Sequence, residues 1–333
     1  MPIIIDICYI LAGFALLIWS ADLFVIGASA TARNLGISPL VIGLTVVGFG
    51  TSAPEILISL IASYGGNPGL AVGNAIGSNI TNIALVLGAT AIIVPLSVHS
   101  DILKREYPLL VLATLLTIVL LAFDNTLGRI DGLLMLMLLA ALMYWIVHKA
   151  LQLRKTENNE PTDPDPLIEE FNDEIPRDMP MKKAMLLLTG GIVLLLVSSK
   201  LLVTGAIDIA QIFGVSDLII GLTIVAIGTS LPELAASIVS ARKGEHDIAL
   251  GNIIGSNLFN TLGVLGVAGL IQPSELISDV LTRDLPVMVG LTILMFIFAF
   301  GRRGGGKITR MEGSILLAIF VSYEVILYFS TLQ

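Results

Sequence analysis

The sequence predicts an all-α polytopic membrane protein, in which ten transmembrane helices form two inverted repeats of five helices each. The first observation is composition: 55% of the 333 residues are hydrophobic and 13% are charged, whereas soluble domains carry about 25% charged residues. The mean hydropathy of +0.93 agrees. The second observation is the number of long apolar stretches, and the third is an internal repeat at an offset of 178 residues. The lipid bilayer is therefore the predicted solvent of most of the chain.

Ten stretches are long and apolar enough for a membrane helix, which needs about 20 such residues. They cover residues 3–21, 37–63, 69–96, 107–123, 128–148, 183–203, 216–241, 247–271, 285–301 and 311–330. A hydrophilic segment divides them five and five. The sequence therefore predicts an N-terminal five-helix repeat over 1–148, an acidic loop over 149–182 and a C-terminal five-helix repeat over 183–333.

The basic residues predict how these spans are oriented. With both termini outside, the inward loops hold fifteen Lys and Arg and the outward loops hold three, Arg129, Lys200 and Arg283, which together make the 18 of the chain. An excess of Lys and Arg in short loops marks the cytoplasmic side. We therefore expect both termini outside and the acidic loop in the cytoplasm.

The net charge of −8 comes from that one loop. Between residues 157 and 178 there are nine acidic residues and a single basic one, Arg177. Four prolines in the same segment are typical of a solvated linker, and this reading is favoured over a Ca²⁺ sensor.

Several classes of protein find no support in the sequence. The single cysteine, Cys8, allows no disulfide within the chain and no Cys-based metal site. No basic stripe with interleaved aromatics suggests nucleic-acid binding. The sequence has neither H-E-x-x-H nor G-x-S-x-G, so we expect no enzyme and no cofactor. No obligatory protein partner is indicated.

The internal repeat is strongest over residues 43–88 and 221–266. These segments align without a gap, and 22 of 46 positions are identical. Because each half holds five spans, an odd number, the second half enters the membrane from the opposite side, and the repeats are inverted. Transporters of this kind place their sites near the midplane, where the repeats meet. Packing alone is the alternative, but it tolerates swaps of similar volume, and the identities fall largely on polar and small residues.

The first repeated motif, G-T-S-x-P-E, predicts a break in the middle of a span. Pro54 and Pro232 have no backbone N–H, so a carbonyl one turn earlier loses its helical partner. Such carbonyls are costly in lipid unless a cation or another group satisfies them. The break is expected to turn the carbonyls of Gly48 and Ala226 inward. Four hydroxyls stand nearby, those of Thr51, Ser52, Thr229 and Ser230.

The same motif ends in Glu55 and Glu233. A charged residue at the bilayer centre costs about 3 kcal/mol on insertion scales, and such residues usually mark function. The alternative is a protonated glutamic acid that joins helices through a hydrogen bond. We favour a functional role because the acid occurs twice, each time beside a helix break.

The second motif, G-N-x-I-G-S-N-x-x-N, places polar side chains on one helix face. Asn74, Ser78 and Asn82 are four residues apart, as are Asn252, Ser256 and Asn260. Close helix packing through small and polar residues is the alternative. We favour packing for the motif glycines Gly73, Gly77, Gly251 and Gly255, and ligand roles for Ser78, Asn82, Ser256 and Asn260.

The donor atoms gathered in this way are all oxygens, which suit Ca²⁺, Na⁺ or Mg²⁺ better than zinc or copper. Two carboxylates neutralise one divalent cation. The same pair could hold several Na⁺, but not together with Ca²⁺, because the bound charges would repel. Mutually exclusive occupancy of one site is what an antiporter requires.

These doubled motifs in two five-span halves resemble the α-repeats of the Ca²⁺/cation antiporter superfamily, and the layout is similar to prokaryotic sodium/calcium exchangers of the cell inner membrane. The resemblance implies that Glu55 and Glu233 are shared ligands of Ca²⁺ and Na⁺, and that Thr51 and Thr229 complete the Ca²⁺ site. It further implies that Asn82 and Asn260 flank the central position. The outer Na⁺ positions would be lined by Ser52, Ser230, Ser78, Ser256 and the carbonyls of Gly48 and Ala226.

The resemblance also implies how the exchanger would work. Spans 1 and 6 would slide across the other eight, and exchange of three Na⁺ for one Ca²⁺ would be electrogenic. Some relatives have Asp where Asn260 stands, and in animal exchangers that Asp accompanies K⁺ dependence, so K⁺-independent exchange is expected here. A Ca²⁺/H⁺ antiporter and, from a different class, a cation channel remain the alternatives.

Overall fold

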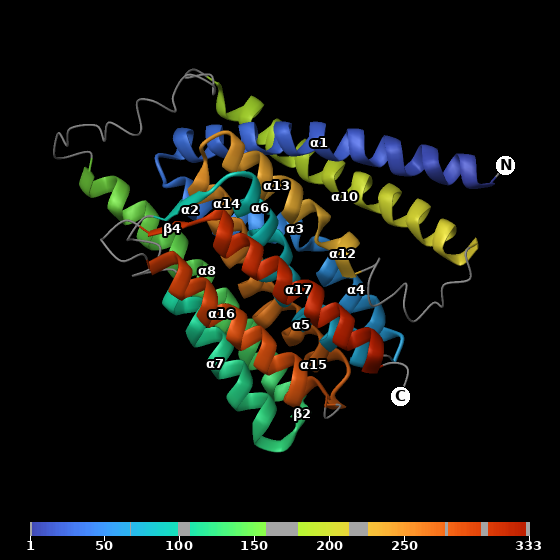
Figure 1. The fold of residues 1–333 in the computed structure, drawn as a ribbon. Helices are drawn as coiled ribbons and strands as arrows, with labels where there is room; N and C mark the ends of the chain where they lie inside the picture. Colours follow the sequence, from blue (N-terminus) through green and yellow to red (C-terminus); the bar gives the residue numbers. More distant parts are fainter. Residues whose placement is uncertain are drawn as a thin grey trace.

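The computed structural model describes residues 2–66, 68–98, 107–157, 179–212, 226–276, 279–300 and 306–330. These residues form a helical bundle (Figure 1). Its long uninterrupted helices are α1 (Pro2–Leu35), α7 (Tyr107–Asp124), α8 (Arg129–Glu157), α10 (Met181–Ile212), α16 (Leu285–Phe300) and α17 (Arg310–Ser330). The prediction of a helical polytopic protein is confirmed at this level.

Other spans are assembled from short pieces, several of them π-helical turns, which are labelled η. The first such run is α2 (Pro39–Ile42), η1 (Gly43–Val47), α3 (Gly48–Thr51) and α4 (Ala53–Tyr64), followed by α5 (Pro68–Thr81), η2 (Asn82–Leu87) and α6 (Gly88–Ile93). In the second half the pieces are α12 (Ala226–Thr229), α13 (Leu231–Arg242), α14 (His246–Leu258), η5 (Phe259–Val264), α15 (Leu265–Ile271) and η6 (Val280–Asp284).

Eight helices among the described residues are long and apolar enough to cross a membrane, and a ninth is added if the bent pair Leu40–Thr51 and Ala53–Tyr64 is one span. The predicted span 216–241 falls partly on residues 213–225, which lie outside the described residues; its remainder forms α12 and α13. The predicted loop 149–182 begins helical, because α8 continues to Glu157. Its acidic part, residues 158–178, also lies outside the described residues.

Two short strand pairs join ends of the two halves. β1 (Leu96–Val98) pairs antiparallel with β4 (Gly306–Ile308), and β2 (Thr126–Leu127) pairs with β3 (Ser274–Glu275). Each pair satisfies backbone groups where the chain leaves a helix, which the hydropathy pattern did not predict.

Helices α1 and α10 lie side by side along one edge of the molecule (Figure 1). Glycines let their backbones meet: a Cβ on Gly27 would stand 2.3 Å from the backbone nitrogen of Leu188, and one on Gly191 would stand 2.6 Å from the Cα of Phe24. A larger residue at either point would force the helices apart. The pair contributes Leu17, Phe24, Leu188 and Leu195 to a second apolar core, which it shares with Ile42, Val47, Ala236 and Ile248 of the neighbouring helices.

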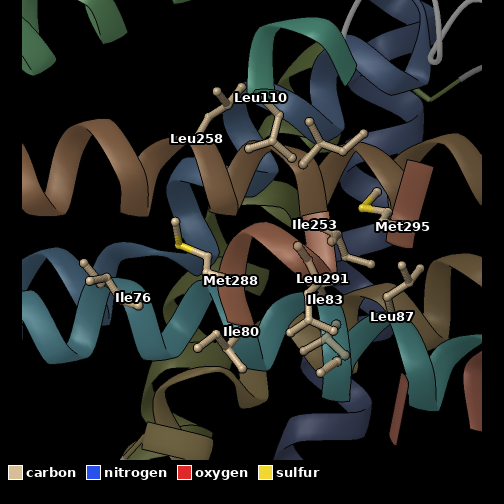
Figure 2. Close-up of a cluster of buried hydrophobic side chains, with 14 of the residues drawn as sticks. Ile76, Ile80, Ile83, Leu87, Leu110, Ile253, Leu258, Met288, Leu291 and Met295 are labelled. Carbon is tan, nitrogen blue, oxygen red and sulfur yellow. The ribbon is translucent and has the colours of Figure 1, made fainter. Parts of the chain in front are cut away.

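The main core lies among the remaining helices. Figure 2 shows its centre, where side chains of α16 meet those of α5, η2 and α14. The labelled members are Ile76, Ile80, Ile83, Leu87, Leu110, Ile253, Leu258, Met288, Leu291 and Met295, all nearly inaccessible. Because α5 and α14 are fully packed on this side, their motif residues on the other faces are held in fixed positions.

Candidate cation site

Two broken helices carry the repeated acidic side chains, Glu55 and Glu233, into the protein interior. α4 begins after Ser52, whose backbone angles are φ −80° and ψ 5°, and α13 begins after Ser230 with φ −88° and ψ 4°. In both helices a proline occupies the second position, as the sequence predicted. The first break bends the chain by 43°. Glu55 and Glu233 therefore lie in the first turn after each break.

Glycine contacts bring the first break against α14. A Cβ on Gly255 would lie 2.4 Å from the carbonyl oxygen of Leu44, and one on Gly48 would lie 3.0 Å from the carbonyl carbon of Gly255. Gly251 is packed equally closely against Leu40. The packing role predicted for Gly251 and Gly255 is confirmed, and it fixes the distance between α3 and the polar face of α14. The same prediction is wrong for Gly73 and Gly77, because a Cβ on either would meet no described atom of a neighbouring element within 4 Å.

Hydroxyl groups from α3, the first break and α14 meet at Glu233. The Ser52 hydroxyl donates to Glu233 Oε1 at 3.3 Å, and the Ser256 hydroxyl donates to the same oxygen at 3.4 Å. Thr51 Oγ1 lies 3.3 Å from Ser256 Oγ. Residues from the two halves of the chain thus form one polar cluster around a carboxylate that is 0% exposed.

Glu55 is equally buried, at 0% exposure. Neither of its carboxylate oxygens meets the geometric criteria of a hydrogen bond with the described residues, although the Thr229 side chain lies close enough to interact with the carboxylate. A protonated acid that served only to join helices would donate a hydrogen bond to a neighbour. The surroundings of Glu55 therefore count against the purely structural reading.

Further polar atoms are buried here without a hydrogen-bond partner among the described residues. Both amide atoms of Asn82 and of Asn260 are in this state, as are Ser78 Oγ, Ser230 Oγ and Glu233 Oε2. A buried polar group left unsatisfied costs about 1–3 kcal/mol. All of these atoms belong to the two repeated motifs, and a bound ligand that satisfied them would remove this cost.

The structure gives less support to the two predicted backbone ligands, the carbonyls of Gly48 and Ala226. The Gly48 carbonyl accepts a hydrogen bond from the backbone N–H of Ser52 at 3.1 Å, so it still has a helical partner here. Ala226 is the first residue of α12, and only its backbone is described. Their roles as ion ligands stay predictions.

Two asparagines of the second motif have a role that the sequence did not assign. Asn252 Nδ2 donates to the Glu233 carbonyl at 3.3 Å and to Ser237 Oγ at 3.0 Å. In the first half, Asn74 Nδ2 donates to the Glu55 carbonyl at 3.1 Å and to Ser59 Oγ at 3.2 Å. Each asparagine therefore anchors the backbone of one acidic residue. The signal in the sequence that could have indicated this role is their position four residues before Ser78 and Ser256, on the same helix face.

π-Helical turns begin beside the site. η2 starts at Asn82, and η5 contains Asn260 at its second position. Such turns are often found at functional sites. No sequence pattern had indicated them.

The arrangement suits a hard cation that binds reversibly. Its candidate donors are two carboxylates with hydroxyl and amide oxygens, and among the described residues no three His, Cys, Asp or Glu side chains come together. Calcium is bound by six to eight oxygens of these kinds. With only two charged ligands, the site can neutralise Ca²⁺ without holding it as a permanent structural ion.

Residues 5–148 and 183–329 match the family described as sodium/calcium exchanger protein. The chain belongs to this family. It is therefore a cation antiporter of the membrane and not an enzyme. The matched residues contain both broken helices and both acidic side chains.

Relatives cover nearly the whole chain. The putative antiporter CaxA of Alkalimonas amylolytica is 50% identical over 97% of this chain and 98% of its own length. The inner membrane protein YrbG of Escherichia coli is 41% identical over 96% and 95% of the two chains. The sodium/calcium exchanger MaX1 of Methanosarcina acetivorans is 31% identical over 98% and 99%.

The fold is also similar to a solved exchanger. The sodium-calcium exchanger NCX_Mj, soaked with Na⁺ and Sr²⁺, superposes with a TM-score of 0.80 at 34% identity and covers 96% of this chain and 97% of its own. The predicted family and its polytopic helical fold are thus confirmed.

Proposed function

We propose that this antiporter exchanges Na⁺ for Ca²⁺ at one site between Glu55 and Glu233. The observation that carries the proposal is the pair of fully buried carboxylates, each beside a helix break, together with buried polar atoms of the same motifs that have no hydrogen-bond partner in the described part of the chain. The name of the matching family and the ions in the NCX_Mj structure support the choice of ions.

In this proposal Ca²⁺ is held by the two carboxylates with Thr51 and Thr229. Sodium ions occupy the carboxylates and the surrounding oxygens, which come from Ser52, Ser230, Ser78, Ser256 and the carbonyls of Gly48 and Ala226, with Asn82 and Asn260 flanking the centre. Two charges 4 Å apart repel by about 4 kcal/mol at an effective dielectric constant of 20. Simultaneous occupancy by Ca²⁺ and Na⁺ is therefore disfavoured, which couples the two fluxes.

Charge balance makes the exchange electrogenic. Two carboxylates neutralise one Ca²⁺, whereas three Na⁺ leave one excess positive charge on the loaded site. Asn260 adds no third carboxylate, which favours exchange that is independent of K⁺ and leaves no further acid to carry a proton.

The proposed architecture has ten spans in two inverted five-helix repeats. Both termini lie outside the cell inner membrane and the acidic loop is cytoplasmic. The matching breaks at Ser52 and Ser230 support the inverted relationship. Access alternates when the α1 and α10 pair slides across the rest of the bundle, and the close backbone contacts of Gly27 and Gly191 within the pair support movement of the two helices as a unit.

The test is ⁴⁵Ca²⁺ uptake into proteoliposomes loaded with Na⁺, compared with vesicles loaded with choline or K⁺, each with and without an imposed pH gradient. Uptake that requires internal Na⁺ is the expected result. Uptake driven only by the pH gradient would replace this proposal with Ca²⁺/H⁺ antiport. Uptake down its own gradient without any counter-ion would indicate a channel.

A further inference from the structure

A groove on the membrane-facing side of the bundle runs between α16 and α17. Its volume is about 360 Å³, and its lining is almost wholly apolar apart from one end. The groove is lined by Val287 from α16, Ile315, Ala318, Ser322 and Ile326 from α17, and Arg283 from η6. Ile315 and Ile326 are 40% and 55% exposed, so the groove opens toward the surrounding lipid.

The length of the groove suits a single acyl chain. Ile315 and Ile326 are separated by eleven residues of α17, which at 1.5 Å per residue is about 16 Å. The hydrocarbon core of a bilayer is about 30 Å thick, so one leaflet accounts for about half of that. The groove therefore spans approximately one leaflet, with Arg283 at the end nearer the C-terminus of α17.

Charged groups surround Arg283 at that end. Its Nε donates to Asp284 Oδ1 at 2.7 Å, and its Nη1 donates to Asp279 Oδ2 at 3.1 Å. The Tyr323 hydroxyl donates to Asp284 Oδ1 at 3.0 Å and ties the cluster to α17. One guanidinium and two carboxylates leave a net charge of −1. The Asp279 side chain is 57% exposed, so its carboxylate is the accessible part of the cluster.

We propose that the groove binds one phospholipid with an ethanolamine headgroup, whose acyl chain lies along α17. The phosphate faces the guanidinium of Arg283, and the primary ammonium donates hydrogen bonds to Asp279. A choline headgroup has no N–H to donate, and an anionic lipid meets a cluster that is already net negative. The combination of Arg283 with an exposed Asp279 therefore favours a zwitterionic lipid that carries hydrogen-bond donors.

The test uses the purified full-length protein and native mass spectrometry, with defined additions of phosphatidylethanolamine, phosphatidylcholine or phosphatidylglycerol. Ala318→Phe fills the groove, and Ala141→Phe makes the same change at an exposed position of α8 outside it. Retention of one phosphatidylethanolamine should fall at least tenfold in Ala318→Phe and stay unchanged in Ala141→Phe. Ser322→Phe blocks the same groove and serves if Ala318→Phe does not fold.

The headgroup is tested by Asp279→Asn, which removes a largely exposed charge. It should bring the preference for phosphatidylethanolamine over phosphatidylcholine close to one while leaving acyl-chain binding in place. Equal retention by Ala318→Phe and Ala141→Phe would overturn the proposal, as would stronger binding of phosphatidylglycerol. A dimer in the parent protein that Ala318→Phe dissociates would also overturn it, because the groove would then be an interface between two copies.

Discussion

The hydroxyl of Thr51 donates to Asn252 Oδ1 across 3.0 Å, although the two residues are 201 positions apart. Asn252 uses its amide nitrogen on the Glu233 carbonyl and on Ser237. One side chain therefore links the first helix break to the backbone of the acid beside the second. All three partners are buried, so these hydrogen bonds hold in the absence of competing water.

Asn252→Ala should weaken Ca²⁺ binding without unfolding the protein. The substitution removes the hydrogen bonds that orient Thr51 and Glu233, and a net loss of about 1–2 kcal/mol corresponds to roughly a five- to thirtyfold weaker affinity. Calcium titration by calorimetry in detergent measures the change directly.

The matched control for this prediction is Asn34→Ala. Asn34 also donates from Nδ2 to a distant backbone carbonyl, that of Met179 at 3.0 Å, but it belongs to neither motif. Its variant should bind Ca²⁺ like the parent. Equal losses in both variants would mean that the effect of Asn252 is general destabilisation.

Glu55→Gln and Glu233→Gln should each reduce exchange at least a hundredfold while the protein remains folded. Each change removes one of the two charges that neutralise Ca²⁺. In the ion-free protein the variants should melt at a higher temperature than the parent, because a buried charge without a cation is destabilising. The parent should gain about 2.7 kcal/mol at a Ca²⁺ concentration one hundred times its Kd, and the variants should gain little.

Glu324→Gln is the control for this pair. Glu324 lies on α17 and has one buried carboxylate oxygen with no hydrogen-bond partner among the residues that the structure describes, but it is not beside either helix break. Its variant should transport normally and keep the Ca²⁺-dependent rise in melting temperature. Robust exchange by both Glu55→Gln and Glu233→Gln would remove the basis of the proposed site.

Most of the spans could be predicted from hydropathy, but their ends could not. The first span was expected to stop at residue 21, because Asp22 interrupts the apolar run, yet α1 continues to Leu35. Asp22 is accommodated because Lys243 from the end of α13 lies 2.9 Å away. A partner that is distant in sequence cannot be found from local hydropathy.

The two helix breaks could be predicted from the sequence, whereas the packing around them could not. The prolines and the repeated acids placed both breaks correctly, since the loss of a backbone donor at Pro54 or Pro232 is a local property. The anchoring role of Asn252 was missed because it depends on which groups face the same side of α14 after packing. The π-helical turns are likewise set by tertiary packing and have no local signature.

Glu245 should make the stability of the protein depend on pH. It lies in the short connection between α13 and α14, where burial raises the pKa of its carboxyl, while the Ser29 hydroxyl and Arg33 offset part of the shift and Asp247 adds to it. With a raised pKa the folded state binds more protons than the unfolded state, so stability falls as pH rises from the ordinary carboxyl range through the folded pKa.

Glu245→Gln cannot lose that proton and should not show this fall. Melting curves in detergent across the acidic to neutral range should therefore show the variant gaining on the parent as pH rises. Glu275→Gln changes an exposed carboxyl on β3 and should follow the parent. A constant difference between Glu245→Gln and the parent at every pH would contradict the expectation.

The ion pair between Asp22 and Lys243 should influence transport more than stability. It joins α1 to the end of α13 with an Nζ to Oδ1 distance of 2.9 Å, and the Asp22 side chain is 47% exposed, so its net contribution is about 0.2–1 kcal/mol. If α1 slides during exchange, the pair favours only the conformation seen here. Asp22→Asn or Lys243→Gln should then change the rate of Na⁺-driven Ca²⁺ uptake by roughly two- to fivefold, with less effect at high salt.

The exchanged pair Asp22→Lys with Lys243→Asp should restore the parental rate, whereas Arg242→Gln at the same helix end should have no effect. Additive losses in the exchanged pair would show that the two charges act independently.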